Sequence, residues 1–184
     1  MGFLAAGTNL ENALAVMILV ARLGDIGSTY LATPTLRMEA NPLMRFGGWK
    51  LALLTLLACL IPYYSAQLGL SALVLSLLVT ASNLSKGWLM RALGEEHYQV
   101  MIATAAARSS LRAALGFVLA GACSVGLAGL IMVFVSGGSG TWGYWAAAGV
   151  VLYALATAFY GSLAAVRLFR RATAPLASAH PDGH

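Results

Sequence analysis

An arginine and an aspartate lie three residues apart within a long apolar stretch near the start of the chain. On one helix face, Arg22 and Asp25 can form an ion pair. An ionisable residue inside a membrane span costs roughly 2.5–3.5 kcal/mol on insertion scales, which makes it a candidate for function. Two interpretations stay open. The pair neutralises itself and fixes helix packing, or its helix face lines a hydrated cavity that binds a ligand.

Other polar residues lie on the same face of this expected helix. At 100° per residue, Glu11 and Thr29 share the stripe of Arg22 and Asp25, and Ser28 lies at its border. Most of these groups fall in the second half of the span. We therefore expect a polar site toward one end of the helix.

The segment that follows adds further acidic, amide and basic groups. Pro42 disfavours a helical conformation at Asn41, so we expect a turn there after Glu39. Lys50 lies at the start of the next apolar stretch and is a candidate partner for Asp25 or Glu39. Carboxylate and amide oxygens suit Mg²⁺ or Ca²⁺, so Asp25, Glu39 and Asn41 are candidate metal ligands.

The third apolar stretch carries neutral polar groups on one face, at Ser76, Thr80, Asn83 and Gly87. Such groups often join helices in membranes, and we favour helix packing over ligand binding for this face. Asn83 lies toward the same end as the other polar groups and joins them as a candidate. The predicted ligand-binding residues are Arg22, Asp25, Ser28, Thr29, Glu39, Asn41, Lys50 and Asn83.

The composition indicates that these residues belong to a membrane protein. Of the 184 residues, 60% are hydrophobic and only 9% are charged, whereas a soluble domain carries about 25% charged residues. About 20 apolar residues span a bilayer. We predict an all-α membrane protein with one domain, residues 1–171, and a disordered cytoplasmic tail, 172–184. The five expected spans are about 10–31, 46–64, 69–90, 111–135 and 142–168.

Basic residues occur in every second connection between the spans, and therefore on one side of the membrane. Ten of the eleven fall in or beside the first loop, the third connection and the C-terminal segment, and Arg22 is the eleventh. The positive-inside rule then places the N-terminus outside and the C-terminus inside the cytoplasm of a prokaryotic inner membrane. The net charge of +5 is explained by this orientation, so no nucleic-acid partner is expected. Residues 91–110 are expected as an interfacial helix or as an extension of span four.

Small residues recur every four positions in spans four and five. Such stripes allow close helix approach and predict a packed scaffold, or an interface with a second copy or another membrane protein. The stripes are Gly116, Ala120 and Ser124; Ala154, Ala158 and Ser162; and Thr157, Gly161 and Ala165.

The stretch from residue 22 to residue 50 resembles a family of small, uncharacterised multispan membrane proteins of bacteria and archaea. That family shows the pattern D-x-x-[ST]-T, then E-[AG]-N-P, then a lysine at the start of the next helix. The corresponding segments here are D-I-G-S-T from Asp25, E-A-N-P from Glu39, and Lys50. Family members often have a glycine before the glutamate, where this chain has Arg37-Met38. No activity is established for the family, so the resemblance marks residues and implies no reaction or cofactor.

Three functions remain open. The first is binding or transport of a cation or small polar solute near the cytoplasmic leaflet. The second is a structural or accessory subunit of a larger membrane complex. The third is a lipid head-group enzyme in which Arg37, Arg45 and Lys50 hold phosphate and Asp25 or Glu39 acts as base. The chain lacks the G-x-S-x-G, H-E-x-x-H and Walker signatures, which favours a protein that is not an enzyme.

Overall fold

The computed structural model describes residues 9–36 and 42–178, and the described residues form helices joined by short connections, with no β-strand among them. The elements are α1 (Asn9–Ala32), α2 (Pro42–Leu54), the 3-10 helix η1 (Thr55–Leu60), α3 (Ile61–Tyr64), α4 (Ala66–Leu93), α5 (Glu95–Ala107), α6 (Leu111–Val135) and α7 (Trp142–Ser178).

Five helical segments are long and apolar enough to cross a membrane. The predicted all-α fold with five membrane-length helices is therefore confirmed for the described residues. The segments are Asn9–Ala32, Met44–Tyr64, Ala66–Leu93, Leu111–Val135 and Trp142–Arg170.

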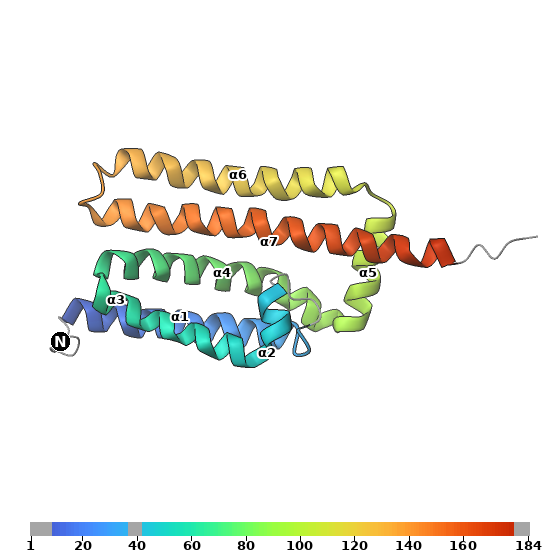
Figure 1. Ribbon diagram of the computed structural model, residues 1–184, viewed down its shortest axis with the longest axis horizontal. Coiled ribbons are helices and arrows are strands. Elements are labelled where there is room, and N and C mark those ends of the chain that lie inside the picture. The colour runs from blue at the N-terminus through green and yellow to red at the C-terminus, as the bar shows by residue number, and fades with distance from the viewer. Residues whose placement is uncertain (1–8, 37–41, 179–184) are drawn as a thin grey trace, which may run out of the picture.

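The long helices lie side by side in an antiparallel bundle (Figure 1). Helices α1, α4 and α7 run in one direction, and α6 and the α2–α3 segment run in the other. One end of the bundle carries the start of α1 and the α3–α4 and α6–α7 connections, and the opposite end carries α5 and the end of α7. The end of α1, the start of α2, helix α5 and the end of α7, which carry or adjoin most of the basic residues of the described chain, lie at this second end, which we call the basic end.

Helices α1 and α4 pack closely around the polar groups. Ile18 is fully buried and packs with Ala21 and Leu73 in one core cluster. A Cβ atom added at Gly24 would lie 3.3 Å from Thr80 Cγ2. Small residues therefore bring α1 and α4 close enough for their polar side chains to reach each other.

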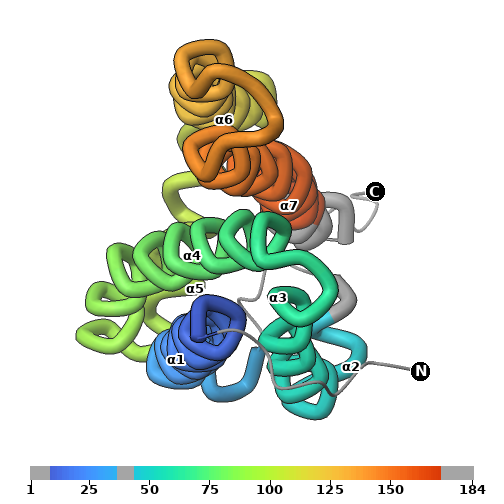
Figure 2. The backbone as a smooth tube through the Cα atoms, turned by 90° about the vertical axis from the view of Figure 1, so that its left-hand side faces the viewer, coloured from blue at the N-terminus to red at the C-terminus, as the bar shows by residue number. Residues whose placement is uncertain are grey.

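Helix α7 packs between α4 and α6, so the bundle is built in layers (Figure 2). Gly149 makes the α4–α7 crossing close, because a Cβ there would lie 2.6 Å from the carbonyl oxygen of Ser71. Gly161 does the same against α6, where a Cβ would lie 2.8 Å from Val118 Cγ1. Helix α6 contacts α7 along its length and presents its other faces outward.

Local signals in the sequence explain where the helices begin and end. The hydroxyls of Ser65 and Ser110 accept hydrogen bonds from the amides of Leu68 and Ala113 at 3.3 and 3.2 Å and cap α4 and α6. Gly94 has a φ of 75°, which side chains other than glycine rarely adopt, and it separates α4 from α5. Residues 95–107 thus form a separate helix rather than an extension of α6.

Two segments differ from what the sequence predicts. The second span contains a kink at Gly48, with φ 59° and ψ −156°, and continues through the 3-10 helix η1. Helix α7 continues through residues 172–178, for which the sequence predicted a disordered tail. The remaining tail residues, 179–184, lie outside the described part of the chain.

Candidate functional site

Arg22 and Asp25 form the ion pair that their spacing predicts. Arg22 Nη1 lies 3.3 Å from Asp25 Oδ2, and the two side chains are 18% and 14% exposed. Both charges therefore lie largely away from solvent, within the apolar α1 segment. A partly buried pair of this kind is costly to break, because removal of one partner leaves the other charge uncompensated.

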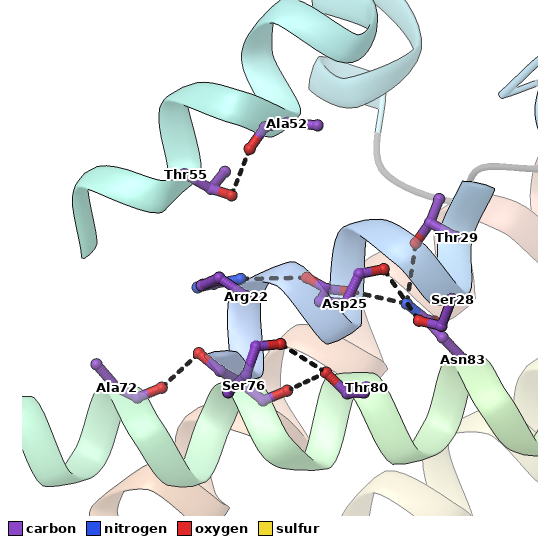
Figure 3. Close-up of polar contacts among 11 residues, drawn as sticks. Arg22, Asp25, Ser28, Thr29, Ala52, Thr55, Ala72, Ser76, Thr80 and Asn83 are labelled. Carbon is purple, nitrogen blue, oxygen red and sulfur yellow. Dashed lines mark hydrogen bonds and ion pairs between the residues drawn. The ribbon is translucent and has the colours of Figure 1, made fainter. Parts of the chain in front are cut away.

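Asn83 brings α4 into the same cluster. Its Nδ2 atom donates to Asp25 Oδ1 at 2.8 Å and lies 3.2 Å from Thr29 Oγ1 (Figure 3). Asp25 thus has a partner on each carboxylate oxygen, Arg22 on one and Asn83 on the other. The structure brings together four of the predicted site residues, Arg22, Asp25, Thr29 and Asn83. We call these four residues the polar cluster.

Other hydroxyls on these helices bond to backbone carbonyl groups. Ser28 Oγ donates to the carbonyl oxygen of Asp25 at 2.9 Å, and Ser76 Oγ donates to that of Ala72 at 2.6 Å. Thr80 Oγ1 lies 3.1 Å from the carbonyl oxygen of Ala21 and so links α4 to α1. These contacts fit the packing role expected for the polar face of α4, and they place Ser28 in the helix interface.

A half-open cavity of about 360 Å³ lies beside the polar cluster. Four walls line it. The first is α1 together with Leu36 from the turn after it, the second is α2 together with Thr55 of η1, and the third and fourth are α4 and α7. The lining residues are Arg22, Asp25, Ile26, Thr29, Leu36, Met44, Gly48, Trp49, Ala52, Thr55, Leu75, Val79, Ser82, Asn83, Tyr153, Ala156, Thr157 and Tyr160.

The cavity is mainly apolar, and among the described residues its charged lining groups are Arg22 and Asp25 of the polar cluster. These two residues have opposite charges, so the described part of the lining carries no net charge. Arg22 Nε is buried and makes no hydrogen bond within the described residues. A buried donor without a partner costs about 1–3 kcal/mol, so the guanidinium has donor capacity that an acceptor oxygen would satisfy.

Helix α7 supplies a wall that the sequence did not predict. Tyr153, Thr157 and Tyr160 all line the cavity, whereas the sequence predicted a packed scaffold or an interface with another chain for span five. Their spacing of four and three residues places them on one helix face, and this polar and aromatic stripe is the signal in the sequence. Thr157 also belongs to a small-residue stripe with Gly161 and Ala165, which favoured the packing interpretation.

Trp49 fixes α2 against the end of α1. Its indole N–H donates to the carbonyl oxygen of Pro34 at 3.2 Å, and its ring meets that of Tyr30 edge-on at 5.5 Å. Thr35 Oγ1 donates to Glu95 Oε2 at 2.7 Å, so α5 also holds this turn. Leu36, which lines the cavity, has a φ of 56° and is buried. The basic end of the cavity is therefore shaped by contacts from α2 and α5.

The structure separates the predicted site residue Lys50 from the polar cluster. Lys50 is exposed on α2 and is not part of the cavity wall. Glu39 and Asn41 lie outside the described residues, so of the three predicted metal ligands only Asp25 is placed. Among the residues described, no three His, Cys, Asp or Glu side chains gather as a metal site would require.

The five apolar helices indicate a multi-pass membrane protein, here with a polar cluster inside its helical bundle. Comparison with protein-family models, with curated proteins and with solved structures finds no match for this chain.

Proposed function

We propose that the chain lies in a prokaryotic inner membrane, with its N-terminus outside and its C-terminus in the cytoplasm. The supporting observation is the gathering of basic connections at one end of the bundle. The positive-inside rule makes that end cytoplasmic. Asp25 lies seven residues before the end of α1, so the polar cluster lies about 10 Å from that end at 1.5 Å per residue.

The function best supported by this arrangement is the binding of a small polar ligand group that carries no net charge. The observation that carries the proposal is the Arg22–Asp25 pair on the wall of a cavity of about 360 Å³. Binding cavities for small molecules typically have volumes of about 300–1,000 Å³, mostly apolar walls and a few convergent polar groups. A zwitterion complements both halves of the pair, with an anionic oxygen for Arg22 and a cationic group for Asp25.

A bare cation is a poorer match than a zwitterion. The guanidinium of Arg22, whose Nη1 lies 3.3 Å from Asp25 Oδ2, repels a cation that brings no anionic group of its own. A metal ion prefers six or more oxygen ligands if it is Ca²⁺ and near-ideal octahedral geometry if it is Mg²⁺. The described cavity wall offers one carboxylate. If the protein transports a polar solute, binding of that solute at the polar cluster would be the first step.

Ligand-dependent stabilisation tests the proposal. The purified chain in detergent is heated with glycerophosphoethanolamine, a water-soluble zwitterion, and separately with sodium or magnesium chloride. A ligand at about 100 times its Kd stabilises by about 2.7 kcal/mol, or about 5–10 °C in Tm for a chain of this size. We expect the zwitterion alone to raise Tm.

The variant Asn83→Leu should lose this rise in Tm, because Asn83 holds Asp25 and Thr29 in place. Ser85→Ala is the matched control on the same helix, since Ser85 is exposed and bonds only the carbonyl oxygen of Ser82. Equal rises in both variants, or stabilisation by the cations alone, would contradict the proposal.

One observation favours an accessory subunit as a second function. Gly116, Ala120 and Ser124 form the predicted small-residue stripe on α6, and all three are exposed in the single chain. Gly116 has no atom within 4 Å of an added Cβ. Purification in mild detergent should then recover a second copy or another membrane protein at fixed stoichiometry, and recovery of a monomer that binds the zwitterion would count against this function.

A further inference from the structure

We propose that the ligand is a membrane lipid with a zwitterionic head group, which reaches the cavity sideways from the bilayer through the gap between α7 and the α2–η1 segment. This inference rests on the proposed binding function and names the class of its ligand. It also assigns a route, which the binding function alone does not require.

The packing of the four walls leaves the cavity open on one side. Helix α1 packs against α4 and η1, and α4 packs against α7. Among the described residues, α7 packs against α4, α5 and α6 but makes no comparable contact with α2 or η1. Figure 2 shows α7 and the α2–α3 segment separated on one side of the bundle. The half-open cavity is lined from both of these segments, and because they make no comparable contact with each other, we place its opening between them.

The opening lies at a depth where lipid surrounds the bundle. Tyr153 and Tyr160 occupy the middle of the membrane-length segment Trp142–Arg170, eleven and eighteen residues after its start. The opposing wall, from Met44 to Thr55, belongs to the half of the second span nearest the basic end. The opening therefore extends from mid-bilayer toward the cytoplasmic interface, and a ligand that passes through it comes from the lipid phase.

The distribution of lining groups orients an amphiphile. The two charges and the amide belong to α1 and α4, on the inner side of the cavity, and the α2 wall at the opening presents Met44, Trp49 and Ala52. A head group placed at the polar cluster leaves its acyl chains toward this apolar wall and the bilayer. At about 360 Å³ the cavity is near the lower limit for a small-molecule site, which suits a head group better than a whole two-chain lipid.

Charge selects among the lipid head groups. The described lining carries no net charge, because Arg22 and Asp25 balance each other. An anionic head group has no cationic group to place beside the Asp25 carboxylate, which would repel it. In phosphatidylethanolamine, the phosphate can accept from Arg22 while the ammonium lies near Asp25. Phosphatidylglycerol, with the same phosphate and no ammonium, lacks the second contact.

Competitive lipid retention measured by native mass spectrometry tests the inference. The full chain in detergent receives equal amounts of phosphatidylethanolamine and phosphatidylglycerol with identical acyl chains. We expect one phosphatidylethanolamine per chain, preferred about tenfold over phosphatidylglycerol, and bound at least about tenfold more tightly than glycerophosphoethanolamine. Ala156→Trp, on the α7 wall of the cavity, should abolish this retention.

The matched control is Ala158→Trp, which lies two residues along α7 and lines a separate apolar groove against α6. It should retain the lipid. Equal retention of both lipids, or equal loss in both variants, would overturn the inference, and the comparison of lipids in the unmodified chain decides even if Ala156→Trp does not fold. Binding of glycerophosphoethanolamine without lipid retention would overturn the inference and leave the proposed function intact, whereas binding of neither would overturn both.

Discussion

Asn83 is the residue that converts two helix faces into one site. Its amide reaches Asp25 and Thr29 across the α1–α4 interface at 2.8 and 3.2 Å. Hydrogen bonds between membrane helices contribute about 0.6 kcal/mol on average and about 1.7 kcal/mol at most. Asn83→Ala should therefore lower the free energy of unfolding by about 1 kcal/mol, measured by denaturant titration in mixed micelles. Ser85→Ala should change it little, and an equal loss in the two variants would show that the amide bonds contribute nothing.

The charges of Arg22 and Asp25 should depend on each other. Breaking a buried pair by removal of one partner costs about 3–5 kcal/mol, and these side chains are 18% and 14% exposed. We expect Asp25→Asn alone to destabilise the fold by about 3 kcal/mol, because Arg22 then remains charged in an apolar segment.

The double variant Arg22→Gln with Asp25→Asn removes both charges and should recover much of that loss. A complete double-mutant cycle measures the coupling, which for residues in contact is about 0.5–3 kcal/mol. Additive effects of the two substitutions would indicate that the pair does not form in the membrane.

At the scale of elements, the crossing of α4 and α7 positions the fourth wall of the cavity. Gly149→Ala would place a Cβ 2.6 Å from the carbonyl oxygen of Ser71, and overpacking of this kind costs about 1–3 kcal/mol. The variant should be less stable and should bind glycerophosphoethanolamine more weakly, as thermal unfolding with and without the zwitterion would measure.

Gly121→Ala is the control for that substitution. An added Cβ at Gly121 meets nothing within 4 Å, and replacing glycine by alanine in a helix stabilises it by up to about 1 kcal/mol. We therefore expect Gly149→Ala to lower Tm and Gly121→Ala to leave Tm unchanged or raise it. Equal shifts would mean that α7 does not pack on α4 at Gly149.

The helices themselves were largely predictable from the sequence, whereas one wall of the site was not. Apolar length predicts a membrane helix because the bilayer core has a fixed thickness, and the 100° periodicity places Arg22 and Asp25 on one face. Nothing local to α7 indicates which helix Tyr153 will face, because that depends on close approach at Gly149 and Gly161. The expected contact between Lys50 and Asp25 was also beyond local prediction. The kink at Gly48 sets the direction of α2, and Lys50 lies exposed on that helix.

At the scale of the whole molecule, the proposed topology has five spans and so places the two ends of the chain on opposite sides of the membrane. In the sequence, ten of eleven basic residues then fall in or beside connections on one side. The proposed position of the polar cluster near the cytoplasmic leaflet follows from this alternation together with its place near the end of α1. The site and the topology therefore depend on the same assignment.

Accessibility of two matched cysteines tests that assignment most directly. In a background with Cys59→Ala and Cys123→Ala, Ser109→Cys and Ser139→Cys place exposed thiols at opposite ends of α6. A membrane-impermeant maleimide added to intact cells should label Cys at position 139 and leave that at position 109 unlabelled until the membrane is opened. Labelling of both sites would contradict the crossing of the membrane by α6, and labelling of position 109 alone would reverse the proposed orientation. Either result would contradict the cytoplasmic location of the polar cluster.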